Sequence, residues 1–176
     1  VAADGARAES GGSITLVPGT SISTSGIASA GLLATAGAGL VSTITATGAT
    51  ITTSGGSNAA IGARANTGGN IVLNGGSVTT QGDGAFGLYA FTTTADAMLT
   101  ATDTVVRTTG NSANAADSIN GKMVLNNASL ITQGAGSIGA RVDNAGILTI
   151  SGGSIVTSGA SAFGLAAVTD SVMNVA

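Results

Sequence analysis

The sequence contains no cysteine and no histidine, and aromatic residues make up only 2% of it. Without cysteine there is neither a disulfide nor a thiolate metal site. Without histidine the chain lacks the usual general base and the commonest metal ligand. We therefore expect no metal and no cofactor.

Charge is also scarce, because only 7% of the residues are charged and the net charge is −3. This charge gives no electrostatic reason to expect nucleic acid as a partner. A mean hydropathy of +0.48 argues against disorder, which goes with low hydropathy and high net charge. The most apolar stretch, residues 26–41, is too short and too often interrupted by Gly, Ser and Thr for a membrane helix. No signal peptide is visible at the N-terminus, so we expect a processed product or an excised piece.

What the chain has in abundance is an internal repeat. A first phrase reads apolar residue, any residue, Thr, any residue, Gly, and its copies begin at Ile22, Ile51, Val78, Val106, Leu130 and Ile155. A second phrase, such as FGLYA at Phe86–Ala90, follows each closing Gly, and a third, such as NIVL from Asn70, precedes each first phrase. In the unit near residues 96–122 the second phrase is degenerate and reads NAADS.

Each unit of roughly 24–29 residues thus offers three short strands separated by turn residues. Residues alternate between two faces, and in FGLYA we expect Phe86, Leu88 and Ala90 to share one of them. The connections are too short for crossover helices, so each strand must pair with its counterpart in the next unit. We predict an all-β fold: one right-handed parallel β-helix over residues 1–176, with three strands per rung and six to seven rungs.

Stacking turns equivalent positions into columns, and the most regular column consists of threonines. By alternation it faces inward with the apolar anchors, which predicts a structural ladder with packed methyls and bonded hydroxyls. The alternative is an exposed array that orders water, as in ice-binding β-helices. An outward patch around Thr50 and Thr52 favours that alternative, whereas Val105 and Arg107 interrupt the patch. The ladder comprises Thr24, Thr53, Thr80, Thr108, Thr132 and Thr157.

A second column, in the middle of the second phrase, faces outward and holds three of the five basic residues. We interpret it as a candidate ligand-binding stripe, with Tyr89 as an aromatic platform for a sugar or a side chain. The alternative is a set of scattered charges that keep the surface soluble. Its members are Arg7, Arg64, Tyr89, Asp117 and Arg141.

Catalytic patterns are missing from the sequence. Glycoside hydrolysis needs two carboxylates close together, but the acidic residues fall at different phases of the repeat. Neither a cluster of oxygen ligands for Ca²⁺ nor a phosphate loop of the GxxxxGK type occurs. The sequence therefore predicts no enzyme and no catalytic residue.

Two stretches, GGSVTTQGDGAFGLYA at Gly75–Ala90 and GGSIVTSGASAFGLAA at Gly152–Ala167, carry a family resemblance. They resemble passenger domains of pertactin-like, type V bacterial autotransporters. The resemblance covers nearly the whole chain and is poorest at Asn111–Lys122. It implies a segment of a longer passenger, exposed on or released from the Gram-negative outer membrane. Its only link to that membrane would be a barrel domain outside this chain.

The resemblance implies a non-catalytic stalk or adhesin in cell-surface attachment. Its expected partners are a host surface protein, a glycan, or another copy of the chain. The alternative is a structural β-helix of another extracellular fibre or assembly. An ice-binding protein and a glycan-active enzyme rank behind both.

Overall fold

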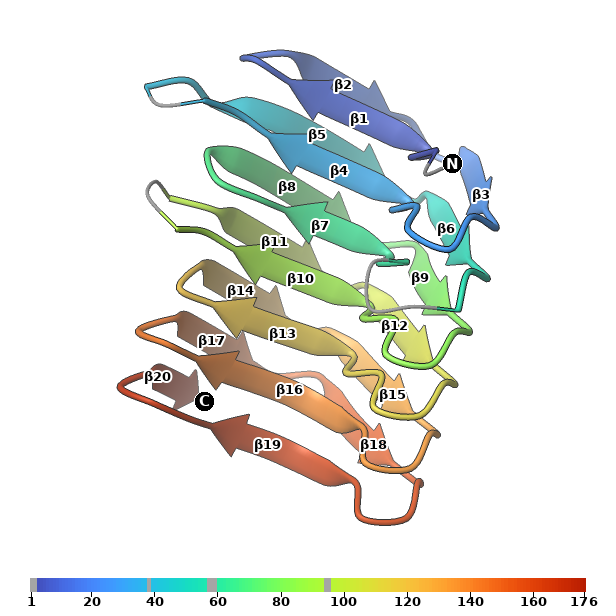
Figure 1. The fold of residues 1–176 in the computed structure, drawn as a ribbon, viewed down its shortest axis with the longest axis vertical. Coiled ribbons are helices and arrows are strands. Elements are labelled where there is room, and N and C mark those ends of the chain that lie inside the picture. The colour runs from blue at the N-terminus through green and yellow to red at the C-terminus, as the bar shows by residue number, and fades with distance from the viewer. Residues whose placement is uncertain (1–2, 38, 57–59, 94–95) are drawn as a thin grey trace.

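The chain is wound into a right-handed parallel β-helix, as predicted (Figure 1). The structure is a computed structural model that describes residues 3–37, 39–56, 60–93 and 96–176. Parts of the predicted domain, residues 1–2, 38, 57–59 and 94–95, lie outside this description. In the described ranges every regular element is a strand, and no helix long and apolar enough to cross a membrane occurs.

The strands form three sheets, which we call A, B and C, and each sheet collects one phrase of the repeat. Sheet A, from the second phrase, contains β1 (Ala6–Glu9), β4 (Leu32–Thr35), β7 (Ala63–Ala65), β10 (Leu88–Phe91), β13 (Ala116–Ile119), β16 (Ile138–Asp143) and β19 (Phe163–Ala167). Sheet B, from the third phrase, contains β2 (Ser13–Leu16), β5 (Ser42–Thr47), β8 (Gly69–Asn74), β11 (Met98–Thr102), β14 (Lys122–Asn126), β17 (Ile147–Ser151) and β20 (Val172–Val175). Sheet C, from the first phrase, contains β3 (Ser21–Thr24), β6 (Thr50–Thr53), β9 (Ser77–Thr80), β12 (Val105–Thr108), β15 (Ser129–Thr132) and β18 (Ser154–Thr157).

Register follows the repeat from rung to rung. Ile51 in β6, for example, pairs with Ile22 in the rung before and with Val78 in the rung after. The unit that is degenerate in sequence keeps this register, because Asp117 in β13 pairs with Tyr89 on one side and Arg141 on the other. Loss of the sequence phrase has therefore not interrupted the backbone of sheet A.

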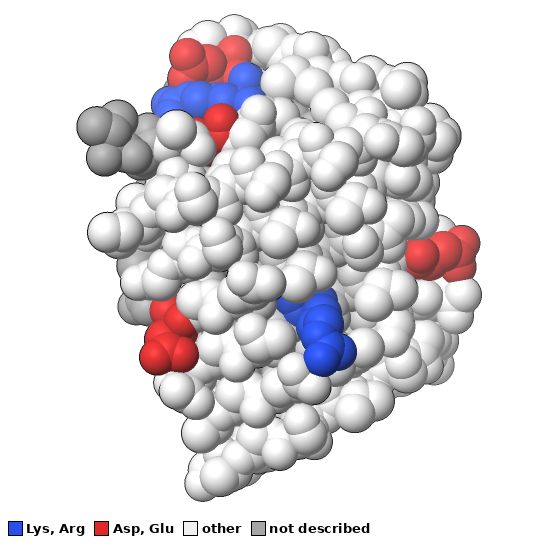
Figure 2. All heavy atoms as spheres, turned by 90° about the vertical axis from the view of Figure 1, so that its right-hand side faces the viewer, with Lys and Arg blue, Asp and Glu red and all other residues white. Residues whose placement is uncertain are grey.

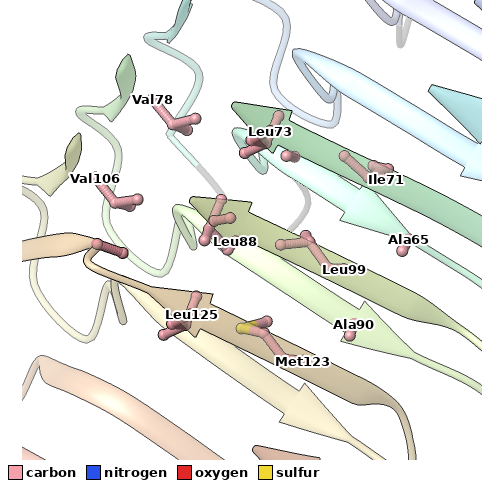
Figure 3. Close-up of a cluster of buried hydrophobic side chains, with 14 of the residues drawn as sticks. Ala65, Ile71, Leu73, Val78, Leu88, Ala90, Leu99, Val106, Met123 and Leu125 are labelled. Atoms are coloured by element: carbon pink, nitrogen blue, oxygen red, sulfur yellow. The ribbon is translucent and has the colours of Figure 1, made fainter. Parts of the chain in front are cut away.

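The core lies between the three sheets and runs along the axis of the stack. In the fourth rung Leu88, Leu99 and Val106 point inward from sheets A, B and C, and each is 0% exposed (Figure 3). Full burial of such a side chain stabilises a fold by about 1.5–3 kcal/mol. The interior rungs repeat this arrangement, so each of them is stabilised mainly by its two neighbours, whereas the rungs at the two ends of the sheets have one neighbour and are more exposed.

Two columns of glycine allow the rungs to approach closely. A Cβ built on Gly110, which closes the first phrase, would lie 2.0 Å from the carbonyl oxygen of Gly82 in the preceding rung. A Cβ built on Gly87, in the second phrase, would lie 2.4 Å from Cγ1 of Val106. Gly110 and Gly87 thus occupy spaces that do not admit a methyl group.

Candidate functional site

The candidate surface is the outer face of sheet A, where the predicted stripe lies. Side chains in β10 alternate between buried and half-buried, which points Tyr89 outward. Register places Arg64 directly before Tyr89 and places Asp117 and then Arg141 after it. Four of the five predicted stripe residues therefore occupy consecutive rungs.

Arg7 is not part of this group. Leu33 stands between Arg7 and Arg64 in the column. The Arg7 guanidinium instead contacts the carboxylates of Asp4 at 3.3 Å and Glu9 at 2.8 Å. Arg7 thus belongs to a local ion-pair cluster in the first rung.

Tyr89 is the centre of an aromatic cluster. Its ring centroid is 5.9 Å from that of Phe91, with the two ring planes nearly parallel at 6°, and 5.5 Å from that of Phe86. Phe91 was missed in the sequence, although strand alternation puts it two residues after Tyr89 on the same face. The prediction that Phe86 shares the inner face with Leu88 is wrong. β10 begins only at Leu88, so the alternation does not extend back to Phe86.

Arg64 lies over this cluster. Its Cζ is 5.8 Å from the centroid of the Tyr89 ring, within the range of a cation–π interaction. Its Nε donates a hydrogen bond of 2.8 Å to Oδ1 of Asn66. In the part of the chain that the structure describes, no carboxylate forms an ion pair with Arg64. We call Arg64, Phe86, Tyr89 and Phe91 the aromatic patch.

Asp117 differs from the other stripe residues because it is 0% exposed although it lies on the outer column. Its carboxylate accepts hydrogen bonds from Asn114 Nδ2 at 2.9 Å and from Arg141 Nη1 at 3.2 Å. Arg141 also forms an ion pair with Asp143. Sequence reasoning missed Asn114 and Asp143, since neither is in the stripe column. Asp117 and Arg141 thus neutralise each other in an ion network.

Burial raises the pKa of Asp117 above its ordinary value, because the charged carboxylate has lost its water. The hydrogen bond from Asn114 and the charge of Arg141 lower this pKa in part. Burial likewise raises the pKa of Tyr89, and the negative charge of Asp117 adds to that effect. Asp117 is therefore better suited to holding Arg141 in place than to meeting a ligand.

The raised pKa of Asp117 predicts a pH-dependent stability. Between the unfolded pKa and the higher folded pKa, the folded state binds more protons, so the free energy of unfolding falls as pH rises. The loss amounts to about 1.4 kcal/mol for each unit by which the pKa is raised. Replacing Asp117 by Asn removes this group, so urea unfolding at a series of pH values should show a flatter profile than the wild type. Equal slopes in this window would contradict the prediction.

The six threonines of the predicted ladder lie on the inner face of sheet C. The hydroxyls of Thr53, Thr80 and Thr108 donate to backbone carbonyl oxygens of the turn that follows, at 3.3, 2.9 and 2.6 Å. All three residues are fully buried. The hydroxyl of Thr132 is buried and has no hydrogen-bond partner among the residues that the structure describes. The hydroxyls of Thr53, Thr80 and Thr108 thus connect each strand to the turn that follows it.

This difference among threonines can be tested with a matched pair of substitutions. Thr108→Val removes the hydrogen bond to the carbonyl of Ala113 and should lower the free energy of unfolding by about 1 kcal/mol. Thr132→Val removes a hydroxyl that has no partner and should leave stability unchanged or raise it. Denaturant unfolding measures both, and equal losses for the two variants would show that the ladder hydrogen bonds do not matter.

The outer face of sheet C carries a small hydroxyl patch. Ser23, Thr52 and Thr79 are in register, but Arg107 follows them in the next rung. Figure 2, which views the molecule from the side of sheet C, shows a mostly uncharged surface with a few separate charged residues and one group of both signs near the top. The outward hydroxyl array therefore covers only three rungs.

The described part of the chain contains no group of three or more acidic side chains placed to hold a metal ion. No protein-family model, no curated protein and no solved structure matches the chain. Two features of the described residues bear on function, namely the continuous three-sheet stack and the aromatic patch.

Proposed function

We propose that the chain is a non-catalytic, surface-exposed segment of a bacterial autotransporter passenger, acting as a rigid stalk with an adhesive face. The observation that carries this proposal is the continuity of the three sheets through successive rungs. Each rung is hydrogen-bonded to its neighbours and shares their apolar core, which makes the stack stiff along its axis. A stiff stack suits the task of holding a binding surface away from a membrane.

The adhesive part of the proposal is supported by the aromatic patch. Tyr and Phe are enriched at protein interfaces, together with Arg, and these are the residue types gathered on sheet A. Three of the four aromatic residues of the chain lie in this patch, so it is the part of the surface best suited to hold a partner.

The weakly charged side of sheet C favours a second candidate function, that of a β-helical component of an extracellular fibre (Figure 2). Low charge permits lateral contact between copies. The reading frame that encodes the chain separates the two candidates. A C-terminal barrel of alternating strands supports the autotransporter, whereas repeats without such a barrel support the fibre.

Exposure at the cell surface is tested with antibodies raised against the purified chain. They are applied to cells of the source organism before and after the outer membrane is permeabilised, with a periplasmic protein as the control. We expect labelling of intact cells that is lost after protease treatment. Labelling that appears only after permeabilisation, as for the control, would contradict the proposal.

A further inference from the structure

The aromatic patch has the chemistry of a sugar-binding surface. The rings of Phe91 and Tyr89, two residues apart on one strand, are stacked with their centroids 5.9 Å apart, and the Phe86 ring is tilted against that of Tyr89 at 5.5 Å. All three are half-buried, so part of each ring meets solvent. Apolar and aromatic surface with a few placed polar groups is the usual lining of a small-ligand site.

Arg64 adds a positive charge at the edge of this surface. Its guanidinium is fixed by the Asn66 hydrogen bond and by the Tyr89 ring, so little side-chain freedom remains to be lost on binding. Arg141, three rungs further along, is already neutralised by Asp117 and Asp143. Arg64 is therefore the cation of this column that a ligand can engage, and a planar carboxylate is the group that matches its fork.

The shape of the surface favours a sugar over a protein side chain. An apolar protein anchor gains its affinity from a pocket that excludes water, and the patch rests on the outer face of a sheet. A pyranose presents one flat C–H face that packs on the exposed part of an aromatic ring, and an acidic sugar adds a carboxylate at its rim. The Asn66 side-chain amide is hydrogen-bonded to Arg64, which puts a polar group beside the guanidinium for the sugar hydroxyls.

From these contacts we propose that the aromatic patch binds an acidic sugar, with the pyranose against Tyr89 and Phe91 and its carboxylate on Arg64. This assignment rests on the proposed adhesive function, because it names the ligand class of that surface. The ion pair lies at the surface, so binding weakens as salt rises.

The chain supplies its own reporter for this site. Tyr89 is its one tyrosine and there is no tryptophan, so tyrosine fluorescence reads the patch directly. The purified chain is titrated with 3′-sialyllactose and with trigalacturonate, with neutral lactose and an acidic peptide as comparisons. We expect a saturable fluorescence change with at least one acidic sugar and none with lactose.

Two arginine substitutions complete the test. Arg64→Gln should lower the association constant about tenfold, which corresponds to loss of a charge-assisted hydrogen bond. Arg107→Gln is the matched control, because Arg107 also points outward in β12 but lies on sheet C. It should change the association constant less than about twofold, and both variants should melt as the wild type does.

Several results overturn the assignment: no saturable change with either acidic sugar, equal binding of lactose, or equal effects of the two substitutions. Binding of the acidic peptide in place of the sugars also overturns the assignment, because it would indicate that the aromatic patch binds a protein. None of these results bears on surface exposure, because antibody labelling reads location independently of sugar binding.

Discussion

Replacing Gly55 by Ala is expected to lower the free energy of unfolding by about 3 kcal/mol, the upper end of the usual cost of overpacking. The new Cβ would lie 2.1 Å from the carbonyl oxygen of Gly26 and 2.8 Å from its carbonyl carbon. Both are backbone atoms of the neighbouring rung, which cannot rotate away as a side chain would. The stack must therefore separate locally, and equilibrium unfolding in urea measures the cost.

The adjacent Gly56 is the matched control. A Cβ built on it meets no atom of the described residues within 4 Å, and Gly56 is exposed. Gly56→Ala should therefore unfold at nearly the wild-type urea concentration. Similar midpoints for the Gly55 and Gly56 variants would show that the rungs are not packed as closely as the glycine column requires.

The second large effect concerns Leu130 and Ala115. In the fourth rung, Gly87 faces the β-branched Val106, whose Cγ1 would lie 2.4 Å from a Cβ built on Gly87. Register puts Ala115 after Gly87 and Leu130 after Val106, so in the fifth rung both members of the pair differ. Leu branches one carbon further out, which leaves room for the methyl group of Ala115.

Leu130→Ile should therefore cost about 2 kcal/mol, since it moves a methyl group toward Ala115. Adding Ala115→Gly should recover most of this loss, because the double variant recreates the pair found at Gly87 and Val106. A double-mutant cycle by urea unfolding should give a coupling energy of about 1–2 kcal/mol. Strict additivity of the two substitutions would mean that the side chains do not share this space.

The fold could be predicted from the sequence because equivalent positions of successive repeats pair with one another in the sheets. Copies of the first phrase at Ile51 and Val78, for example, occupy paired positions in sheet C. In a β-helix one register error would turn every later side chain to the wrong face, so matching phrases leave few alternatives. Even the degenerate unit could be placed, because the phrases on either side of it fix its length.

The site could be predicted only in part. Alternation correctly places Tyr89 and Arg64 in one outward column, but it fails for Phe86, which precedes β10 and lies outside any strand. The burial of Asp117 could not be foreseen either. It depends on Asn114, a residue of the degenerate phrase whose side chain reaches both Asp117 and the backbone of Ile138. Such contacts depend on turn geometry, which the period of the repeat does not encode.

The ion network and the aromatic patch occupy different parts of the outer column of sheet A and have different roles. Asp117 and Arg141 are occupied with each other, whereas Arg64 and Tyr89 meet solvent. A rigid scaffold that fixes a small exposed site is the arrangement expected of an adhesive stalk. Rigidity of the stack is therefore the property on which the proposed function depends most.

That rigidity is measured most directly by distances between pairs of spin labels on introduced cysteines, because the native chain has none. Ser23, Ile131 and Val156 belong to one outward column of sheet C, with Ile131 four rungs and Val156 five rungs from Ser23. At about 4.8 Å per rung, the pair 23/131 should lie about 19 Å apart and the pair 23/156 about 24 Å apart. Both distributions should be narrow.

A flexible chain would instead place residues 23 and 131 about 50–60 Å apart with a broad distribution. Narrow distances that increase by about one rung spacing between the two pairs support a rigid β-helix. Broad distances, or an increase that does not match one rung, would contradict both the β-helix and its use as a stalk.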